Sequence, residues 1–193
     1  MELIFATHNN NKVKEVTKML PSYLSMKSLT DINFFDEIEE TGTTFEENAQ
    51  LKAKTIFDKT GKNIFADDSG LVIEALDGAP GVYSARYAGT GKDEDNIAKA
   101  LKELEGKTNR KAYFISIFCL ILDGKEYFFK GRVNGTIATE IMGDNGFGYD
   151  PIFIPDGFSK SFAQMSPEEK NAISHRGKAV EKLNDFLTNL NVN

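Results

Sequence analysis

Apolar residues along the chain occur either in short continuous runs or at helical spacing, and the two patterns alternate from one end to the other. The short runs predict strands over residues 2–6, 63–66, 71–73 and 112–122, and the segments 23–29 and 126–133, in which apolar and polar residues are mixed, are predicted as strands as well. The helical repeats predict helices over residues 12–20, 45–60 and 93–104, and a final amphipathic helix marked by Leu183, Phe186, Leu187 and Leu190. Strands interleaved with helices indicate an α/β fold.

Turn and capping residues mark the ends of several of these elements. Pro21 stops the first helix, and Gly61 ends the second, which we expect to begin at a capping box over residues 43–46. Asp123 and Gly124 separate two strands and predict a tight hairpin. Because a hairpin pairs its strands antiparallel, the sheet should be mixed.

Composition places the chain among compact globular proteins. Hydrophobic residues make up 40% and charged residues 27% of its 193 residues, which excludes a mainly disordered chain and fits one domain over residues 1–193. With 23 basic and 29 acidic residues the net charge is −6, which argues against a nucleic-acid partner. One cysteine allows no internal disulfide, and no apolar run approaches a membrane helix in length. Since its N-terminus lacks a secretory pattern, we expect a cytoplasmic protein without a membrane partner.

Thr7–Lys12 is a polar segment between a predicted strand and a predicted helix. This layout offers backbone N–H groups and the positive end of the helix dipole to an anion, so it predicts a phosphate site. The glycine-rich sequences of Walker-type and Rossmann sites do not occur in the chain, which argues against both classes. By spacing alone, the alternative that the asparagines simply suit a tight connection stays open.

Asp67 and Asp68 stand in an Asp-Asp-Ser-Gly sequence that predicts a turn between the strands at 63–66 and 71–73. If the backbone is still extended there, the two side chains point to opposite faces. Together with the acids near Glu40 they can hold Mg²⁺, which prefers carboxylate and water oxygens. The alternative is a solvated turn beside an ordinary acidic face.

The basic residues beside these motifs are isolated in the sequence: Lys12, Lys52, Lys170 and Arg176. Each is a candidate for binding an anion, although isolated lysines are mostly surface charges. His175 and Arg176, at the start of the last helix, are interpreted equally well as a surface pair. Cys119 and the aromatic residues from Tyr113 to Phe118 fall in a buried strand and are interpreted as core.

Six short segments occur in one order along the chain. They are Thr-His-Asn-Asn-Asn-Lys at 7–12, Glu-Glu-Thr-Gly to Glu-Asn-Ala at 39–49, Ala-Asp-Asp-Ser-Gly-Leu at 66–71, Gly-Ala-Pro-Gly-Val-Tyr-Ser-Ala-Arg at 78–86, Gly-Phe-Gly-Tyr-Asp-Pro at 146–151 and Ser-His-Arg-Gly at 174–177. In these segments, which run from Thr7 to the last helix, the chain resembles the inosine triphosphate pyrophosphatase family. One segment alone would be weak, but six in the right order are specific.

The resemblance implies an elongated mixed β-sheet with flanking helices that form two lobes around a central active-site cleft. It also implies a homodimer. The substrate would be a purine nucleoside triphosphate, namely ITP, dITP or XTP. With Mg²⁺ as cofactor, the enzyme would hydrolyse it to the monophosphate and pyrophosphate.

The resemblance further implies roles for individual residues. Asp68 would be the general base and, with Glu40, a metal ligand; Asp67 and Glu39 are the neighbouring alternatives. The substrate-binding residues would be Thr7, His8, Asn9, Asn10, Asn11, Lys12, Lys52, Ser69, Phe147, Gly148, Tyr149, Asp150, Lys170, His175 and Arg176. Among them, Thr7–Lys12 and Lys52 would bind the triphosphate, and Phe147 would stack on the base.

Two other classes of function stay open at this point. One is a nucleotide-binding module without turnover, and the other is an enzyme for a different substrate, such as another modified nucleotide or another phosphoester. The presence of both Glu40 and Asp68 favours an enzyme, because a binding module needs neither carboxylate. No residue pattern ranks ITP, dITP and XTP.

Overall fold

The computed structural model describes residues 1–191, and within them the strands form one six-stranded mixed sheet. The strands are β1 (Glu2–Phe5), β2 (Ser25–Ser28), β3 (Ile64–Ile73), β4 (Lys111–Leu122), β5 (Lys125–Ile137) and β6 (Phe153–Pro155), in the order β2-β1-β3-β4-β5-β6. β1 is parallel to β2 and β3, whereas β5 and β6 are antiparallel. The predicted mixed α/β fold is confirmed.

The helices flank this sheet. They are α1 (Asn10–Met19), α2 (Phe45–Thr60), α3 (Asp93–Glu103), α4 (Pro167–Ile173) and α5 (His175–Asn191), with 3₁₀ turns η1 (Glu74–Leu76), η2 (Gly81–Arg86), η3 (Asp150–Ile152) and η4 (Phe162–Gln164). Gly61 ends α2 as expected, at φ 62°, a left-handed conformation that suits glycine. Among the helices within residues 1–191, none is long and apolar enough to cross a membrane.

The chain folds into two compact units. The first unit contains Met1–Asp68, Ser116–Gly131 and the segment from Arg176 onward, and the second contains Ser69–Ile115 and Arg132–His175. The chain therefore passes from one unit to the other inside β3, β4 and β5, and again at the start of α5.

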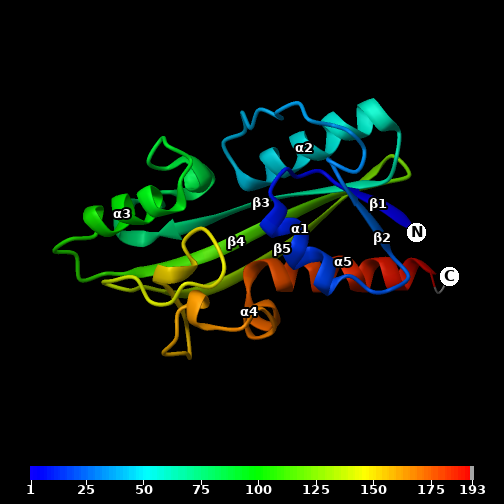
Figure 1. Cartoon of the computed structure of the whole chain (residues 1–193). Helices are drawn as coiled ribbons and strands as arrows, with labels where there is room; N and C mark the ends of the chain where they lie inside the picture. The colour runs from blue at the N-terminus through cyan, green and yellow to red at the C-terminus, as the bar shows by residue number, and fades with distance from the viewer. Residues whose placement is uncertain (192–193) are drawn as a thin grey trace. The chain divides into compact units, whose positions relative to one another are not determined.

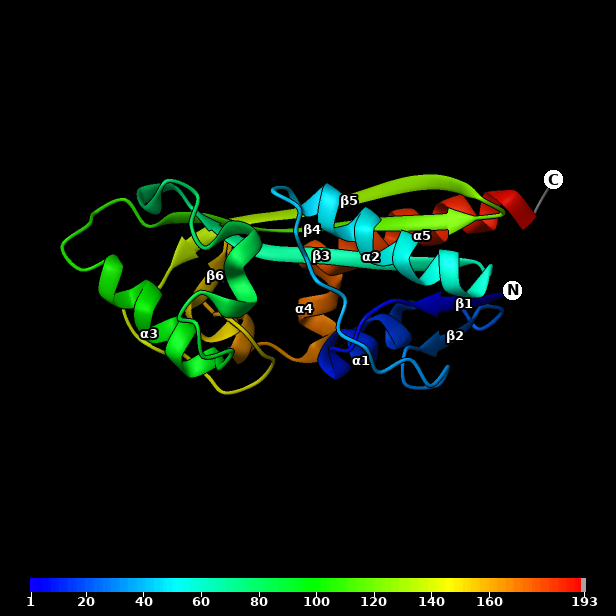
Figure 2. The same cartoon turned by 90° about the horizontal axis from the view of Figure 1, so that it is seen from above.

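In the first unit, helices cover both faces of the strands. Figure 1 shows α2 on one face and α1 and α5 on the other, and the view from above in Figure 2 agrees. On the α1 and α5 face, the rings of Phe5, Phe65 and Phe118 stack, with 4.6 Å between the centroids of Phe5 and Phe65. Val16 of α1 and Leu183 of α5 belong to the same core.

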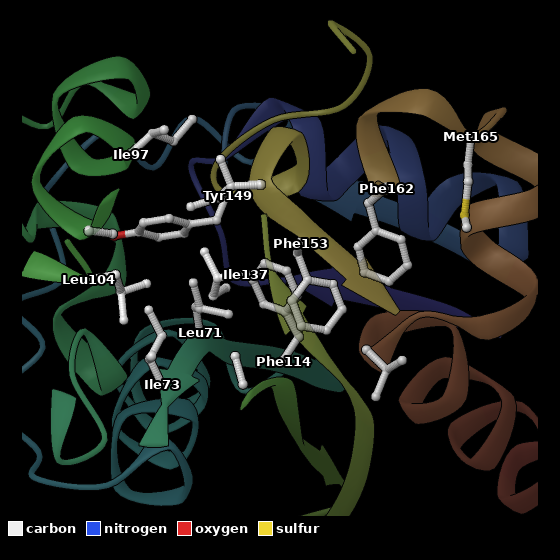
Figure 3. Packing of buried hydrophobic residues seen from close by; sticks show 14 residues of the cluster. Leu71, Ile73, Ile97, Leu104, Phe114, Ile137, Tyr149, Phe153, Phe162 and Met165 are labelled. Carbon is white, nitrogen blue, oxygen red and sulfur yellow. The ribbon is translucent and has the colours of Figure 1, made fainter. Parts of the chain in front are cut away.

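The second unit has a core of its own, drawn in Figure 3. The ring of Phe114 meets that of Phe153 edge to face, with 4.7 Å between centroids. The ring of Tyr149 lies beside Ile97 and Leu104 in Figure 3. Tyr149 therefore packs the segment that follows β5 against α3. This packing places the glycine-rich segment before Tyr149 at the surface of the second unit.

The predicted turn at residues 67–70 is wrong, because β3 runs without interruption from Ile64 to Ile73. Asp67 and Asp68 are buried in the middle of a strand, at 0% and 5% exposure, rather than solvated at a strand end. The turn-forming composition is overridden because both carboxylates find polar partners on neighbouring helices.

Two boundaries also differ from prediction. The capping box of α2 lies one residue later than expected, with Thr44 as N-cap and Glu47 as its partner. The hairpin at Asp123 and Gly124 is present, but β5 continues to Ile137, well beyond the expected end at residue 133. Buried and exposed residues alternate along β5 up to Ile137. Because the exposed residues beyond residue 133 are polar, the predicted strand ended there.

Candidate active site

Asp67 and Asp68 are neighbours in the middle of β3, and their carboxylates point in opposite directions. Successive side chains of a strand point to opposite faces, so Asp67 shares a face with Phe65, toward α1 and α5. Asp68 points to the other face, where α2 lies (Figure 1). The alternation expected for extended backbone is therefore confirmed, and each carboxylate has its own surroundings.

On the first face, Asp67 is part of a buried network of charges. Nζ of Lys12 lies 3.0 Å from each carboxylate oxygen of Asp67, and Nη2 of Arg176 lies 3.6 Å from Oδ2. Nη1 of Arg176 also donates to Oε2 of Glu15 at 2.5 Å. Burial lowers the pKa of the Lys12 ammonium, and the Asp67 carboxylate offsets this only in part. An added anion beside Lys12 would therefore be stabilised.

On the second face, Asp68 and Glu40 converge on one lysine. Nζ of Lys52 hydrogen-bonds to Oε1 of Glu40 and lies 3.8 Å from Oδ1 of Asp68. Nδ2 of Asn48, one helical turn before Lys52 on α2, donates to Oδ2 of Asp68 at 3.1 Å. The two carboxylates thus face the same point from different segments.

The segment that carries Glu40 is fixed by Asn48 as well. The backbone N–H of Gly42 donates to Oδ1 of Asn48 at 2.8 Å. A β-carbon on Gly42 would come within 2.6 Å of that oxygen, so only glycine fits there. Glu40 is half-buried against Lys52 whereas Glu39 is exposed, so Glu40 is the acid of this pair that the structure places beside Asp68.

The charges on this face shift the pKa values of Asp68 and Lys52. Burial raises the pKa of the Asp68 carboxyl; Lys52 opposes this and Glu40 adds to it. For Lys52, burial lowers the pKa of the ammonium, but the carboxylates of Asp68 and Glu40 outweigh burial and leave it raised. Lys52 therefore stays charged, while Asp68 has a greater affinity for a proton than an ordinary aspartate.

The donor atoms around Lys52 fit a magnesium ion. Mg²⁺ is usually held by one or two carboxylates, with water and substrate phosphates completing its shell. Glu40 and Asp68 supply two such carboxylates around one point, where their charges already attract an ammonium. Residues 1–191 contain no group of three or more histidine, cysteine, aspartate or glutamate side chains arranged to hold a metal. Water molecules and substrate phosphates would complete the shell of an ion held by Glu40 and Asp68.

The Thr7–Lys12 segment leads from β1 into the first residues of α1, which begins at Asn10. Asn9 is the N-cap, and its Oδ1 accepts from the backbone N–H groups of Asn11 at 2.9 Å and Lys12 at 3.2 Å. Oγ1 of Thr7 accepts from the N–H of Asn9, and Nε2 of His8 lies 2.9 Å from the carbonyl oxygen of Asp36. Part of the helix terminus is thus satisfied by its own cap, as the tight-connection alternative expects, while the side chains of Asn10 and Asn11 are exposed.

In the second unit, Asp150 organises the predicted base-binding segment. Its Oδ2 accepts from the backbone N–H of Phe147 at 3.1 Å and from Nζ of Lys170 at 2.6 Å. The same ammonium lies 4.9 Å from the centroid of the Phe147 ring. Asp150 is 2% and Lys170 4% exposed, so this is a buried charge pair beside a half-buried aromatic ring.

The alternative that these side chains lie at the surface is wrong for four of the predicted site residues. Lys52, Lys170, His175 and Arg176 are all buried, and His175 stacks on Phe114 in the second unit with 4.6 Å between centroids. Their partners lie far away in the sequence, so no local pattern could reveal them. Ser69 is half-buried in β3 next to Asp68, and Cys119 is core as predicted.

Two further residues contact the predicted site residues. Asn48 holds Asp68, and Glu15 holds Arg176. Helical spacing could have indicated both residues. Glu15 lies three residues after Lys12 and Asn48 four residues before Lys52, so each shares a helix face with a predicted site residue.

The fold and the charged residues define a class: a mixed α/β protein with a carboxylate pair around a lysine in one unit and a buried aspartate–lysine pair beside an aromatic ring in the other. The chain belongs to the Ham1 family, whose model matches residues 3–186. It is 51% identical to a dITP/XTP pyrophosphatase of Flavobacterium johnsoniae over 97% of this chain and 98% of that protein. The Bacillus subtilis dITP/XTP pyrophosphatase is 50% identical, over 96% of each.

Solved structures agree with the fold. A HAM1 protein from Coxiella burnetii superposes with a TM-score of 0.90 at 41% identity, covering 98% of this chain and 99% of that one. The Staphylococcus aureus Ham1 protein gives a TM-score of 0.89 at 41% identity over the same shares of the two chains. The resemblance drawn from the six sequence segments is therefore confirmed at the level of family and fold.

Proposed function

We propose that this protein hydrolyses noncanonical purine nucleoside triphosphates, namely dITP, XTP and ITP, to the monophosphate and pyrophosphate. The observation that carries the proposal is the convergence of Glu40 and Asp68 on Lys52. The chain's 50–51% identity with dITP/XTP pyrophosphatases over nearly its whole length supports the substrate class.

Residues of the first unit would bind the triphosphate. The substrate carries several negative charges, and attack by water brings more charge to the same phosphates. The ammonium groups of Lys12 and Lys52 would offset this charge, with Thr7, His8 and Asn9–Asn11 along the phosphates and Arg176 also in contact with substrate. Ser69, the first residue of the second unit, would touch the substrate as well. Because burial disfavours the charged form of Lys12, binding of an anion there would be favourable.

Asp68 would act as the general base in attack on the α-phosphorus. Asn48 holds Oδ2, so the proton of the attacking water would pass to Oδ1, the oxygen turned toward Lys52. Burial raises the pKa of this carboxyl, which brings its proton affinity closer to that of a useful base near neutral pH. Lys52 would keep the ionised form available before the substrate binds.

Glu40 and Asp68 would also hold Mg²⁺. When bound, the ion would supply positive charge against the phosphates and lower the pKa of water. The chain's own contribution is to keep two carboxylates turned toward one point, with Asn48 fixing both the Asp68 side chain and the backbone at Gly42.

Residues of the second unit would recognise the base. Phe147 would stack on it, with Gly148, Tyr149 and Asp150 completing the segment, and Lys170 and His175 would supply hydrogen-bond donors. Hypoxanthine and xanthine present a 6-oxo acceptor where adenine presents an amino donor. An unsatisfied donor costs roughly 1–3 kcal/mol, which corresponds to about 5- to 150-fold discrimination against ATP.

The assembly and compartment belong to the same proposal. A homodimer is supported by the resemblance to the family. We propose a cytoplasmic location, where the nucleotide pool lies, and a net charge of −6 supports the absence of a nucleic-acid partner. We expect no membrane partner either. Light scattering of the purified protein would test the dimer.

Product analysis tests the activity itself. The protein is incubated with Mg²⁺ and dITP, XTP, ITP, ATP or GTP, and the products are separated as pyrophosphate or orthophosphate. We expect pyrophosphate, released from the first three much faster than from ATP. Equal rates on ATP and ITP would refute the specificity, stepwise orthophosphate would refute attack on the α-phosphorus, and binding without turnover would indicate a nucleotide-binding module.

A further inference from the structure

The base-binding segment of the second unit is held from inside by its own residues. Phe147 and Asp150 close a tight turn, since the N–H of Phe147 donates to Oδ2 of Asp150 and the N–H of Asp150 donates to the carbonyl of Phe147 at 3.3 Å. A β-carbon on Gly146, which has φ 75°, would collide with the Asp150 carboxylate, so the turn requires glycine there. These contacts set the shape of the segment but do not attach it to the rest of the unit.

Two contacts attach the same segment to the region of η2 and α3. The backbone N–H of Gly148 donates to Oδ2 of Asp93 at 2.7 Å, across 55 residues of sequence. The hydroxyl of Tyr149 donates to the carbonyl of Ser84 in η2 at 2.7 Å. Tyr149 is buried against the core, whereas Asp93 is an exposed residue at the first position of α3.

The region that holds the segment is itself well fixed. Asn96 of α3 is 2% exposed; its Oδ1 accepts from the N–H of Ala88, and its Nδ2 donates to the carbonyl of Ala85. Oγ of Ser84 donates to the carbonyl of Gly81 and accepts from the N–H of Leu71 in β3. A residue attached to this region can therefore hold the base-binding segment in one position.

We propose that Asp93 is a positioning residue for base recognition, which acts by holding the backbone of Gly148 and so the ring of Phe147. The inference rests on the proposed function, because it assumes that the Phe147–Asp150 segment receives the base. A carboxylate that accepts from a backbone N–H forms a charge-assisted hydrogen bond, roughly twice as strong as a neutral one. Its loss would leave Tyr149 and Asp150 held by Ser84 and Lys170 but would release the backbone at Gly148, next to Phe147, without removing any residue that touches the substrate.

The competing explanation is that Asp93 only supplies negative charge to the first turn of α3. Glu94 and Asp95 lie in the same turn, and any of these acids suits the positive end of the helix. Oδ2 of Asp95 already accepts from Oγ1 of Thr90, whereas Glu94 is exposed. Glu94→Ala is therefore the matched control, because it removes one charge from the same turn and leaves the contact with Gly148 intact.

The test compares Asp93→Ala, Asp93→Asn and Glu94→Ala with the unchanged protein, using dITP and dATP as substrates. For Asp93→Ala we expect KM for dITP to rise about tenfold with kcat changed much less, and the preference for dITP over dATP to fall by a similar factor. Asp93→Asn should lose less, because its amide oxygen accepts the same hydrogen bond without the charge. Glu94→Ala should behave as the unchanged protein does.

Inhibition by inorganic tripolyphosphate, which has no base, separates positioning of the base from general damage. We expect its inhibition constant to be the same in all four proteins. Values of KM and preference within about twofold of the unchanged protein for Asp93→Ala, or an equal loss in Glu94→Ala, would overturn the inference. So would a tripolyphosphate constant that rises together with KM.

The design also separates this inference from the proposed function. If the unchanged protein releases no pyrophosphate from dITP, the proposed function fails, and the Asp93 contact is then judged by calorimetric dissociation constants of dITP in the same four proteins. A dissociation constant that rises about tenfold only in Asp93→Ala supports the inference, and equal constants refute it. If the unchanged protein is active and Asp93→Ala matches it, the inference alone is wrong.

Discussion

The two faces of β3 hold neighbouring aspartates in different ways. On the α1 and α5 face, Asp67 is fully buried, and Lys12 and Arg176 approach it from two helices. On the α2 face, Asp68 and Glu40 both lie beside the ammonium of Lys52. The described contacts thus balance charge on the Asp67 face, whereas on the Asp68 face two carboxylates meet one lysine.

This difference in charge leads us to expect a structural role for Asp67 and a catalytic role for Asp68. Removing one member of a buried, balanced network leaves its partners charged in an apolar surrounding, which is strongly destabilising. A site with more negative than positive charge attracts a cation and holds a proton more firmly, which is what metal binding and general-base catalysis require. We therefore expect changes at Asp67 to affect mainly stability and changes at Asp68 mainly turnover.

The largest effect is expected for Asp68→Asn. The amide has nearly the same size but cannot accept the proton and binds Mg²⁺ poorly, so kcat should fall by about 10² to 10⁴. Thermal stability should be kept or slightly raised, because burial and Glu40 both disfavour the ionised carboxylate. The relevant repulsion comes from Glu40, not Asp67, since Asp67 lies on the opposite face. Initial rates and melting curves of the same preparations check both statements.

Asp67→Asn should lower the stability of the fold and affect turnover much less. It leaves Lys12 and Arg176 beside a neutral amide, and breaking a buried ion pair costs about 3–5 kcal/mol. For a chain of this size each kcal/mol lowers the melting temperature by roughly 2–4 °C. Calorimetry or circular dichroism measures the loss. A melting temperature equal to that of the unchanged protein would show that the Asp67 network does not stabilise the fold.

Lys12→Met should weaken triphosphate binding by a smaller factor. If its ammonium contacts the phosphates as proposed, such charge-assisted contacts are worth about 1.5–3 kcal/mol, so KM should rise roughly 10- to 150-fold. A lysine with its head in solvent would be replaceable at no cost in stability, but Lys12 is only 14% exposed and pairs with Asp67. Some loss of stability is therefore expected as well. An unchanged inhibition constant for tripolyphosphate would place the phosphates elsewhere.

The smallest effect concerns the dependence of stability on pH. Because the pKa of Asp68 is raised in the folded protein, mainly by burial, the folded state binds its proton more tightly than the unfolded state does. This contribution is fully present below the ordinary aspartate pKa and is lost as the pH rises through the higher folded value. We therefore compare the free energy of unfolding of the unchanged protein with that of Asp68→Asn, both without Mg²⁺. The difference between the two should fall as the pH rises from the ordinary aspartate pKa through the raised pKa of the folded protein. A rising difference would contradict the sign of the shift.

Elements with local signals were predictable from the sequence. The apolar spacing within α2 and the stop at Gly61 both appear in the structure, as does the hairpin at Asp123 and Gly124. These features depend on residues within a few positions of each other, so propensity and pattern are enough. The six segments likewise identified the family and the fold without any structure.

Features that depend on distant contacts were not predictable in this way. Residues 67–70 have the composition of a turn, but partners such as Lys12, 55 residues away, keep them in a strand. Lys170 looks like a surface charge until Asp150 is placed beside it. The contact between Asp93 and Gly148 has no local signal at all. Local rules fail most often at functional sites, where buried polar groups need specific partners.

The central claim, that the chemistry belongs to the Asp68 face of β3, is tested most directly by comparing two variants. Initial rates of pyrophosphate release from dITP are measured for Asp67→Asn and Asp68→Asn, at saturating Mg²⁺ and at a temperature where circular dichroism shows both folded. Our account predicts that Asp67→Asn keeps at least about a tenth of the original turnover and Asp68→Asn at most about a hundredth. Near-normal turnover in Asp68→Asn together with an inactive Asp67→Asn would contradict it.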